Sequence, residues 1–255
     1  SRLHCPALFR LSRMAYDSGI LEFKDEAEVE DYMRDLGLRF EFGCRKEKNA
    51  QSEPWYETYK HSPKRCAEIL KPNCFDMKYG DSCLKYGVFK LFGKTDVARD
   101  PLEAYQAFEF GCKSAQHSKC CQAAGRLIAE GIVSHSPTLT AALPLFERGC
   151  KLGLAESCFH LGGASITLAT KLEGAHSKTK VTDSPDTLRA KALAAWSEGC
   201  KLGHELSCRN VARMYAIGDG VPVDKQKSDE FLLNADKICS QPDSFDANPT
   251  PSPSA

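Results

Sequence analysis

The sequence has no excess of charge of either sign, because 34 Lys and Arg residues balance 34 Asp and Glu residues among its 255. A chain without net charge has no global field to attract nucleic acid or an anionic membrane, so neither is expected as a partner. No apolar run approaches the roughly 18 residues of a membrane-spanning helix. Residues 1–13 also lack the apolar stretch of a secretory signal. We therefore expect a soluble globular protein without membrane insertion.

Catalytic motifs are absent as well. There is no Gly-x-Ser-x-Gly elbow, no Gly-rich phosphate loop and no His-Glu-x-x-His pair. Two Ser-x-x-Lys matches, Ser82 to Lys85 and Ser177 to Lys180, lack the Ser-Asp-Asn and Lys-Thr-Gly motifs that accompany them in serine hydrolases of that type. The sequence therefore predicts a protein that is not an enzyme.

The two ends of the chain differ in composition from the middle. Residues 1–13, before the first methionine Met14, are Arg-rich and free of acidic residues. We expect them to be an upstream segment outside the native protein, with a mitochondrial transit peptide as the alternative. Residues 241–255 are rich in Pro and Ser and are expected to form a disordered tail. The folded domain is predicted over 14–240.

Cysteine, in contrast, is abundant, and nine of its 13 positions form two periodic series. A first series is separated by 38, 38, 50 and 39 residues, and a second series, 8 or 9 positions behind it, by 38, 37 and 50. The first series is Cys74, Cys112, Cys150, Cys200 and Cys239, and the second is Cys83, Cys121, Cys158 and Cys208. Repetition at this period is typical of a solenoid of helical hairpins.

The residues between the cysteines predict two helices in each repeat, helix A and helix B. Apolar residues fall at helical spacing in CLKYGVFKLFG and in DPLEAYQAFEFGC, on either side of a turn that contains glycine. We expect glycine to end each helix A, at Gly93, Gly131 and Gly218 or Gly220. Small residues are expected where helices approach closely, at Gly87, Gly125, Gly162 and Ala212 and, from helix B, at Ala104, Ala142 and Ala192.

This pattern resembles the Sel1-like repeat, a relative of the tetratricopeptide repeat. The resemblance implies an all-α fold, an α/α superhelix of antiparallel hairpins. The predicted repeats span about 44–74 in degenerate form, then 81–112, 118–150, 155–200 and 205–239. The repeat over 155–200 carries about 12 extra residues between its helices, which we interpret as a surface loop near 173–185.

The hairpins predict disulfide bridges, because the first cysteine lies in the last turn of helix B and the second in the first turn of the next helix A. The nine residues CKLGLAESC return as CKLGHELSC, with a glycine to end the first helix. We predict the pairs Cys74–Cys83, Cys112–Cys121, Cys150–Cys158 and Cys200–Cys208. Each is expected to contribute roughly 2 to 3 kcal/mol through the unfolded state.

Other cysteines are harder to assign. Cys120 adjoins Cys121, but Gly125 lies four residues after Cys121, which matches the other repeats and favours Cys121 as the partner. Cys44 has no partner near Pro54, so either it pairs with Cys66 or the sequence is damaged there. The pairing of Cys5, Cys120 and Cys239 is left open. Zinc is not expected, because no two cysteines have the close spacing of structural zinc sites.

The order of the motifs supports a sharper resemblance. The opening MAYDSGILEFKDEAEVEDYMRDLGLRFEFGC, the cysteine-bridged repeats and the final YAIGDGVPVDK resemble the Sel1-repeat cytochrome c oxidase assembly factors of the mitochondrial intermembrane space. The resemblance implies a soluble protein, trapped by the disulfide-relay import receptor, that helps to assemble respiratory chain complex IV. Its partners would be complex IV subunits or other assembly factors, held on the concave helix A surface.

The resemblance also raises haem binding, which this sequence supports little. Gln122 and Glu130 stand where histidines of the family are expected, and there is no Cys-x-x-Cys-His. His117 is expected to be solvated, and His160 and His204 to pack or to cap helices. We therefore expect no cofactor. The alternatives to an assembly factor are a secreted or endoplasmic-reticulum adaptor built from the same repeats, and a haem- or copper-handling redox protein.

Overall fold

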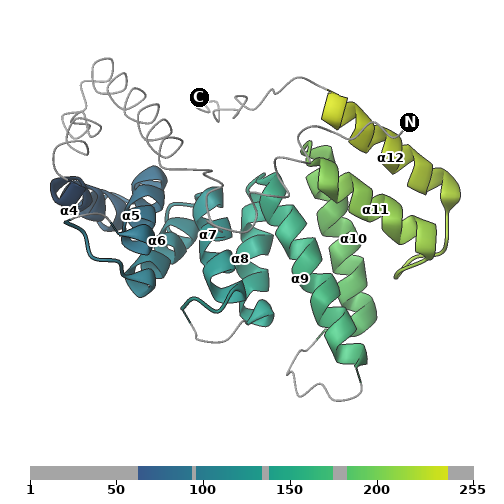
Figure 1. Ribbon diagram of the computed structural model, residues 1–255, viewed down its shortest axis with the longest axis horizontal. Helices are drawn as coiled ribbons and strands as arrows, with labels where there is room; N and C mark the ends of the chain where they lie inside the picture. Colours follow the sequence, from purple (N-terminus) through teal and green to yellow (C-terminus); the bar gives the residue numbers. More distant parts are fainter. Residues whose placement is uncertain (1–62, 94–95, 134–137, 175–182, 241–255) are drawn as a thin grey trace.

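The computed structural model describes residues 63–93, 96–133, 138–174 and 183–240, and every regular element in these ranges is an α-helix. The predicted segments 1–13 and 241–255, and most of the degenerate repeat, lie outside the described residues. The helices are α4 (Pro63–Phe75), α5 (Gly80–Phe92), α6 (Pro101–Lys113), α7 (Ser118–Ala129), α8 (Leu139–Lys151), α9 (Ala155–Glu173), α10 (Pro185–Lys201), α11 (Glu205–Ile217) and α12 (Lys225–Ser240). They follow one another from one end of the molecule to the other (Figure 1).

The helices form antiparallel hairpins that pack on their neighbours in the sequence. Helices A are α5, α7, α9 and α11, and the helices B that follow them are α6, α8, α10 and α12. Each helix packs mainly against the one before it and the one after it. Such nearest-neighbour packing is what defines a solenoid, so the predicted α/α superhelix is confirmed. The four hairpins correspond to the predicted repeats 81–112, 118–150, 155–200 and 205–239.

Local sequence explains where the helices begin and end. The side chain of Asp100 accepts a hydrogen bond from the Glu103 amide at the start of α6, and Pro101 supplies a first helical residue that needs no donor. Ser184 and Pro185 start α10 in the same way. The glycines predicted to end each helix A, namely Gly93, Gly131, Gly218 and Gly220, all have positive φ angles.

The two helices of a hairpin meet through a glycine on helix A and an aromatic side chain on helix B. A methyl group added to Gly87 would lie 2.3 Å from the Phe108 ring, and one added to Gly162 would lie 2.3 Å from Nε1 of Trp196. Gly125 stands in the same relation to Phe146. Because the ring occupies the space that a Cβ atom would need, the prediction of close approach at these glycines is confirmed. The aromatic residue lies four positions before the first cysteine of each bridge, and its ring is the reason why a glycine is needed opposite it.

In the last hairpin, alanine replaces both the glycine and the aromatic residue of this pair. Ala212 on α11 and Ala235 on α12 occupy the equivalent positions, and both are buried. The aromatic residues Tyr86, Phe89, Phe108 and Phe146 are also buried, as are the predicted small residues Ala104, Ala142 and Ala192.

Adjacent glycines on α9 offer a direct test of this packing. Gly162→Ala should destabilise the fold by about 1 to 3 kcal/mol, because the methyl group collides with the Trp196 ring. Gly163→Ala should stabilise it by about 0.5 to 1 kcal/mol, because open space surrounds that position and alanine favours a helix. Urea unfolding of the oxidised protein measures both changes. Equal effects of the two substitutions would contradict the packing described here.

Candidate functional site: a ladder of disulfides beside the helix A face

Four disulfides tie each helix B to the next helix A. They are the four predicted pairs, Cys74–Cys83, Cys112–Cys121, Cys150–Cys158 and Cys200–Cys208. Their Cα atoms are 4.5 to 4.7 Å apart, within the range that a disulfide spans. Seven of the eight sulfur-bearing residues are buried, and Cys150 is half-buried. The bridges therefore belong to the core of each junction between repeats.

The shorter bridges enclose a Schellman turn, the motif in which a left-handed residue ends a helix. Gly153 has a φ angle of 82°, its amide donates to the Cys150 carbonyl, and the Leu154 amide donates to the Gly149 carbonyl. Gly203 repeats the arrangement with a φ angle of 87°. A left-handed residue without a Cβ atom lets helix B turn directly into the next helix A, and it brings the two cysteines together.

The longer bridges, with a sequence separation of 9, contain one more residue in the turn. Their left-handed residues are not glycine but Lys78, with a φ angle of 58°, and Gln116, with a φ angle of 50°. Two turn geometries therefore serve the same covalent link, and the difference between spacings of 8 and 9 lies in the loop.

Successive bridges touch one another through small residues that sequence analysis did not single out. The residue before the first cysteine is glycine at Gly111, Gly149 and Gly199, and the residue before the second is Ser82, Cys120, Ser157 or Ser207. A methyl group added to Gly149 would lie 2.4 Å from Ser157 Oγ and 3.3 Å from Cys121 Cβ of the preceding bridge. Gly199 contacts Ser207 and Cys158 in the same way. The bridges thus form a ladder, and the repeated Gly-Cys and Ser-Cys dipeptides were the signal for it.

The additional pair Cys44–Cys66 is contradicted, because Cys66 is a free, buried thiol in the structure. Cys66 lies in the first turn of α4, and its charged neighbour is Lys85 of α5. Burial raises the pKa of Cys66 to about 12 and lowers that of Lys85 to about 7. Cys44 and Cys5 lie outside the described residues. Cys120 is the second free, buried thiol, as expected from the choice of Cys121, and Cys239 is disulfide-bonded.

A polar network joins the first three described helices. Glu103 of α6 accepts hydrogen bonds from Tyr86 of α5 and from Lys71 of α4, and it forms an ion pair with Lys90 of α5 at 2.8 Å. Burial opposes ionisation of Glu103, but these three donors outweigh it and lower the pKa of Glu103 to about 2. One carboxylate therefore connects α4, α5 and α6.

The three histidines that the structure describes, His117, His160 and His204, each make contacts within the fold. His204 and His117 cap α11 and α7, and the Nε2 atom of His117 lies 3.1 Å from Asp81, which corrects the expectation that His117 is solvated. His160 stacks on Phe146 at 5.4 Å between ring centroids. Burial lowers the pKa of His160 to about 4, and the positive charge of Arg126 acts in the same direction.

These residues do not fit a haem group. Within the described ranges, the imidazoles cap helices or stack on aromatic rings, and the two free thiols are buried at 0 to 1% exposure. No axial ligand among them faces an open cavity. The described part of the chain also contains no group of three His, Cys, Asp or Glu side chains placed to hold a metal ion.

One stripe along the surface of the helices A is the candidate for binding. It is formed by the residues two before, one after and five after each second cysteine, which share one helix face. Its members, called the helix A face here, are Asp81, Leu84, Val88, Lys119, Gln122, Arg126, Glu156, Phe159, Gly163, Leu206, Arg209 and Arg213. All except Leu84 are half-buried or exposed. Lys119 and Arg213 are its exposed cations.

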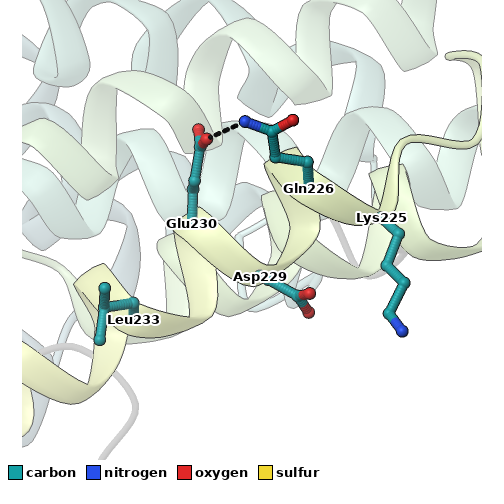
Figure 2. A pocket seen from close by; sticks show the side chains of 5 residues that line it. All are labelled: Lys225, Gln226, Asp229, Glu230 and Leu233. Carbon is teal, nitrogen blue, oxygen red and sulfur yellow. Dashed lines mark hydrogen bonds between the residues drawn. The ribbon is translucent and has the colours of Figure 1, made fainter.

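A depression of about 550 Å³ lies instead on the terminal helix α12. It is lined by Lys225, Gln226, Asp229, Glu230 and Leu233, all from this one helix (Figure 2). Gln226 donates to Glu230 at 3.1 Å, whereas Asp229 and Lys225 point away from that pair. Side chains that diverge from a single helix do not form a catalytic site. Across the described ranges, no helix is both long and apolar enough to cross a bilayer.

The helical hairpins and their bridges define a Sel1-like repeat solenoid. A Sel1 repeat protein from Oxalobacter formigenes has the same fold, with a TM-score of 0.55 at 16% identity over 91% of this chain and 83% of that one. No family model matches the sequence.

Named relatives show to which family of Sel1-like repeat proteins the chain belongs. The chain is 31% identical over 225 residues to cytochrome c oxidase assembly factor 7A of Xenopus laevis, covering 86% of this chain and 92% of the relative. It is 29% identical over 229 residues to cytochrome c oxidase assembly factor 7 of Homo sapiens, covering 87% and 94%. The chain belongs to the cytochrome c oxidase assembly factor 7 family.

Removing one bridge tests its energetic role. The double substitution Cys200→Ala with Cys208→Ala should lower the free energy of unfolding by about 2 to 3 kcal/mol, because the unfolded chain regains the entropy of a loop of that length. Both cysteines are replaced so that no thiol is left to form wrong pairs. An unchanged denaturation midpoint in urea would show that the turn alone fixes the junction.

The Glu103 network should give stability a specific pH dependence. Because the pKa of Glu103 is about 2 in the folded protein and about 4.3 unfolded, its contribution is present above about pH 4.3 and lost as the pH falls toward 2. Glu103→Gln should destabilise the fold by about 1 to 3 kcal/mol at pH 7 and by progressively less in acid. Glu147→Gln, which breaks an exposed pair with Lys151, is the control and should have little effect. A pH-independent difference would contradict this assignment.

Proposed function

We propose that this protein is a non-enzymatic assembly factor for cytochrome c oxidase, respiratory complex IV, and acts in the mitochondrial intermembrane space. The observation that carries the proposal is family membership, with 31% identity over 86% of the chain. The relatives are named for assembly of cytochrome c oxidase. The bridges support the compartment, because disulfides persist where the surroundings are oxidising.

The protein works as a scaffold that holds another polypeptide. Solenoids present long, continuous surfaces for this purpose, and the helix A face supplies one whose members, Leu84 excepted, are half-buried or exposed. Its partners are complex IV subunits or other assembly factors, and the import receptor of the disulfide relay binds it while its bridges form. No nucleic acid, membrane insertion or resident cofactor is part of this role.

The first test is depletion from the cells that make the protein. We expect loss of cytochrome c oxidase activity, co-migration of the protein with partly assembled complex IV on native gels, and protection from protease until the outer mitochondrial membrane is ruptured. Recovery in the secretory pathway would instead support the adaptor. A Soret band or stoichiometric copper in the purified protein would support the redox alternative.

Charge reversal on the helix A face tests whether the partner binds there. Lys119→Glu with Arg213→Glu changes the two exposed cations of that face and should abolish co-migration with the intermediates. The control, Lys113→Glu with Lys151→Glu, makes the same charge change on helices B and also breaks two exposed i,i+4 ion pairs. It should retain co-migration although it is the more destabilised of the two. Equal loss in both variants, with both folded by circular dichroism, would exclude the helix A face as the binding site.

A further inference from the structure

One residue type departs from the pattern at the junctions between repeats. The position before each second cysteine holds serine in three repeats, at Ser82, Ser157 and Ser207, and cysteine in one, at Cys120. All four side chains are buried, with exposures of 0 to 1%. Cys120 therefore places a free thiol where the other repeats place a hydroxyl group.

This position lies beside the preceding bridge. A methyl group on Gly199 would lie 2.6 Å from Ser207 Oγ and 3.3 Å from Cys158 Cβ, so the small side chain and the earlier bridge flank the same point. At the repeat that contains Cys120 the spacing is tighter. A methyl group on Gly111 would lie 2.7 Å from Cys120 Sγ and 2.8 Å from Cys83 Cβ.

The thiol of Cys120 thus borders the Cys74–Cys83 disulfide, and Gly111 leaves the space between them free of a side chain. Cys120 Sγ also donates a hydrogen bond to the carbonyl of Gly80 at 3.5 Å, in the same first turn of α5 that carries Cys83. Among the described residues, Cys120 and Cys66 are the two free thiols. Cys66 lies two turns before Cys74 on α4 itself, whereas Cys120 lies on α7, in the repeat that follows the Cys74–Cys83 bridge.

We propose that Cys120 exchanges with the Cys74–Cys83 disulfide and so gives the protein a second pattern of bridges. The sulfur of Cys120, as thiolate, attacks Cys83 Sγ; the new Cys83–Cys120 bond forms as the Cys74–Cys83 bond breaks. Cys74 leaves as a thiolate and takes up the proton that Cys120 gave up. One disulfide and one thiol are present before and after, so no external oxidant or reductant is needed.

The exchange moves a covalent link from one end of the solenoid toward its interior. In the first pattern a disulfide ties α4 to α5, whereas in the second a disulfide ties α5 to α7, and α4 is held by the backbone turn to α5 and by noncovalent contacts such as Lys71 with Glu103. Burial raises the pKa of Cys120 well above its usual value, and the nearby charge of Asp81 adds to this effect. The closed structure therefore keeps Cys120 protonated, and exchange proceeds through local opening of this junction.

The experiment is a disulfide map of the full-length oxidised protein. The protein is equilibrated near neutral pH, quenched in acid, alkylated with a maleimide under denaturing conditions and digested with pepsin, which limits further exchange. Because an isomer a few kcal/mol above the native state is populated at about 0.1 to 10%, we expect peptides that join Cys83 to Cys120 and alkylated Cys74 at that level. Cys120→Ser, which installs the residue of the other three repeats, should reduce alkylation of Cys74 to background.

A transplanted thiol tests the geometry independently. In the Cys120→Ser background, Ser157→Cys places a thiol beside Cys121. The introduced thiol should form a disulfide with Cys121 and leave Cys112 alkylated. Cys66→Ser should leave the exchange unchanged. The proposal is overturned if Cys74 stays unmodified in the wild type, if its alkylation persists in Cys120→Ser, or if Cys120 is found joined to Cys112 with Cys121 free.

Discussion

The short covalent span between one hairpin and the next is the constraint on which the solenoid depends. Within the described helices each repeat contacts only its neighbours, so the register of each junction has to be set at the junction itself. A disulfide with Cα atoms 4.5 to 4.7 Å apart, at every described junction, fixes where each helix A starts relative to the helix before it. The residue before a bridged cysteine is small where successive bridges meet, at Gly111, Gly149 and Gly199, because a methyl group there would meet the next small residue and the preceding bridge.

Different parts of each helix A consequently serve different purposes. The first turn carries the bridge in all four, the middle carries a glycine that receives an aromatic ring in α5, α7 and α9, and a left-handed glycine follows α5, α7 and α11. These requirements occupy the faces toward helix B and toward the previous repeat. The helix A face carries neither the bridges nor these glycines, and it presents the mixture of Lys, Arg, Phe and Glu on which the proposed partner binding rests.

Much of this organisation could be read from the sequence, because a period of cysteines records covalent links directly. The four pairs, the hairpins and the glycines were predicted from spacing alone. The partners of those glycines were missed, since matching Gly162 to Trp196 requires the length of the turn, and the inserted loop hides it. Cys66 was proposed as the partner of Cys44 because neither had another partner in the sequence pattern, and the pattern does not show which way the helix of Cys66 faces. Lys85 is 3% exposed, and periodicity cannot reveal a buried lysine.

The pairing of a glycine with an aromatic ring inside each hairpin also determines how such a protein can change by recombination. A genetic crossover in the turn between helices A and B could join α11, which carries Ala212 in place of the glycine, to a helix B that carries Trp196 or Phe108. The methyl group of the alanine would then meet the aromatic ring. A crossover between a bridge's cysteines keeps each hairpin intact and joins junctions that share the same small residues. The heritable unit of this solenoid is therefore the complete hairpin, bounded by its bridges.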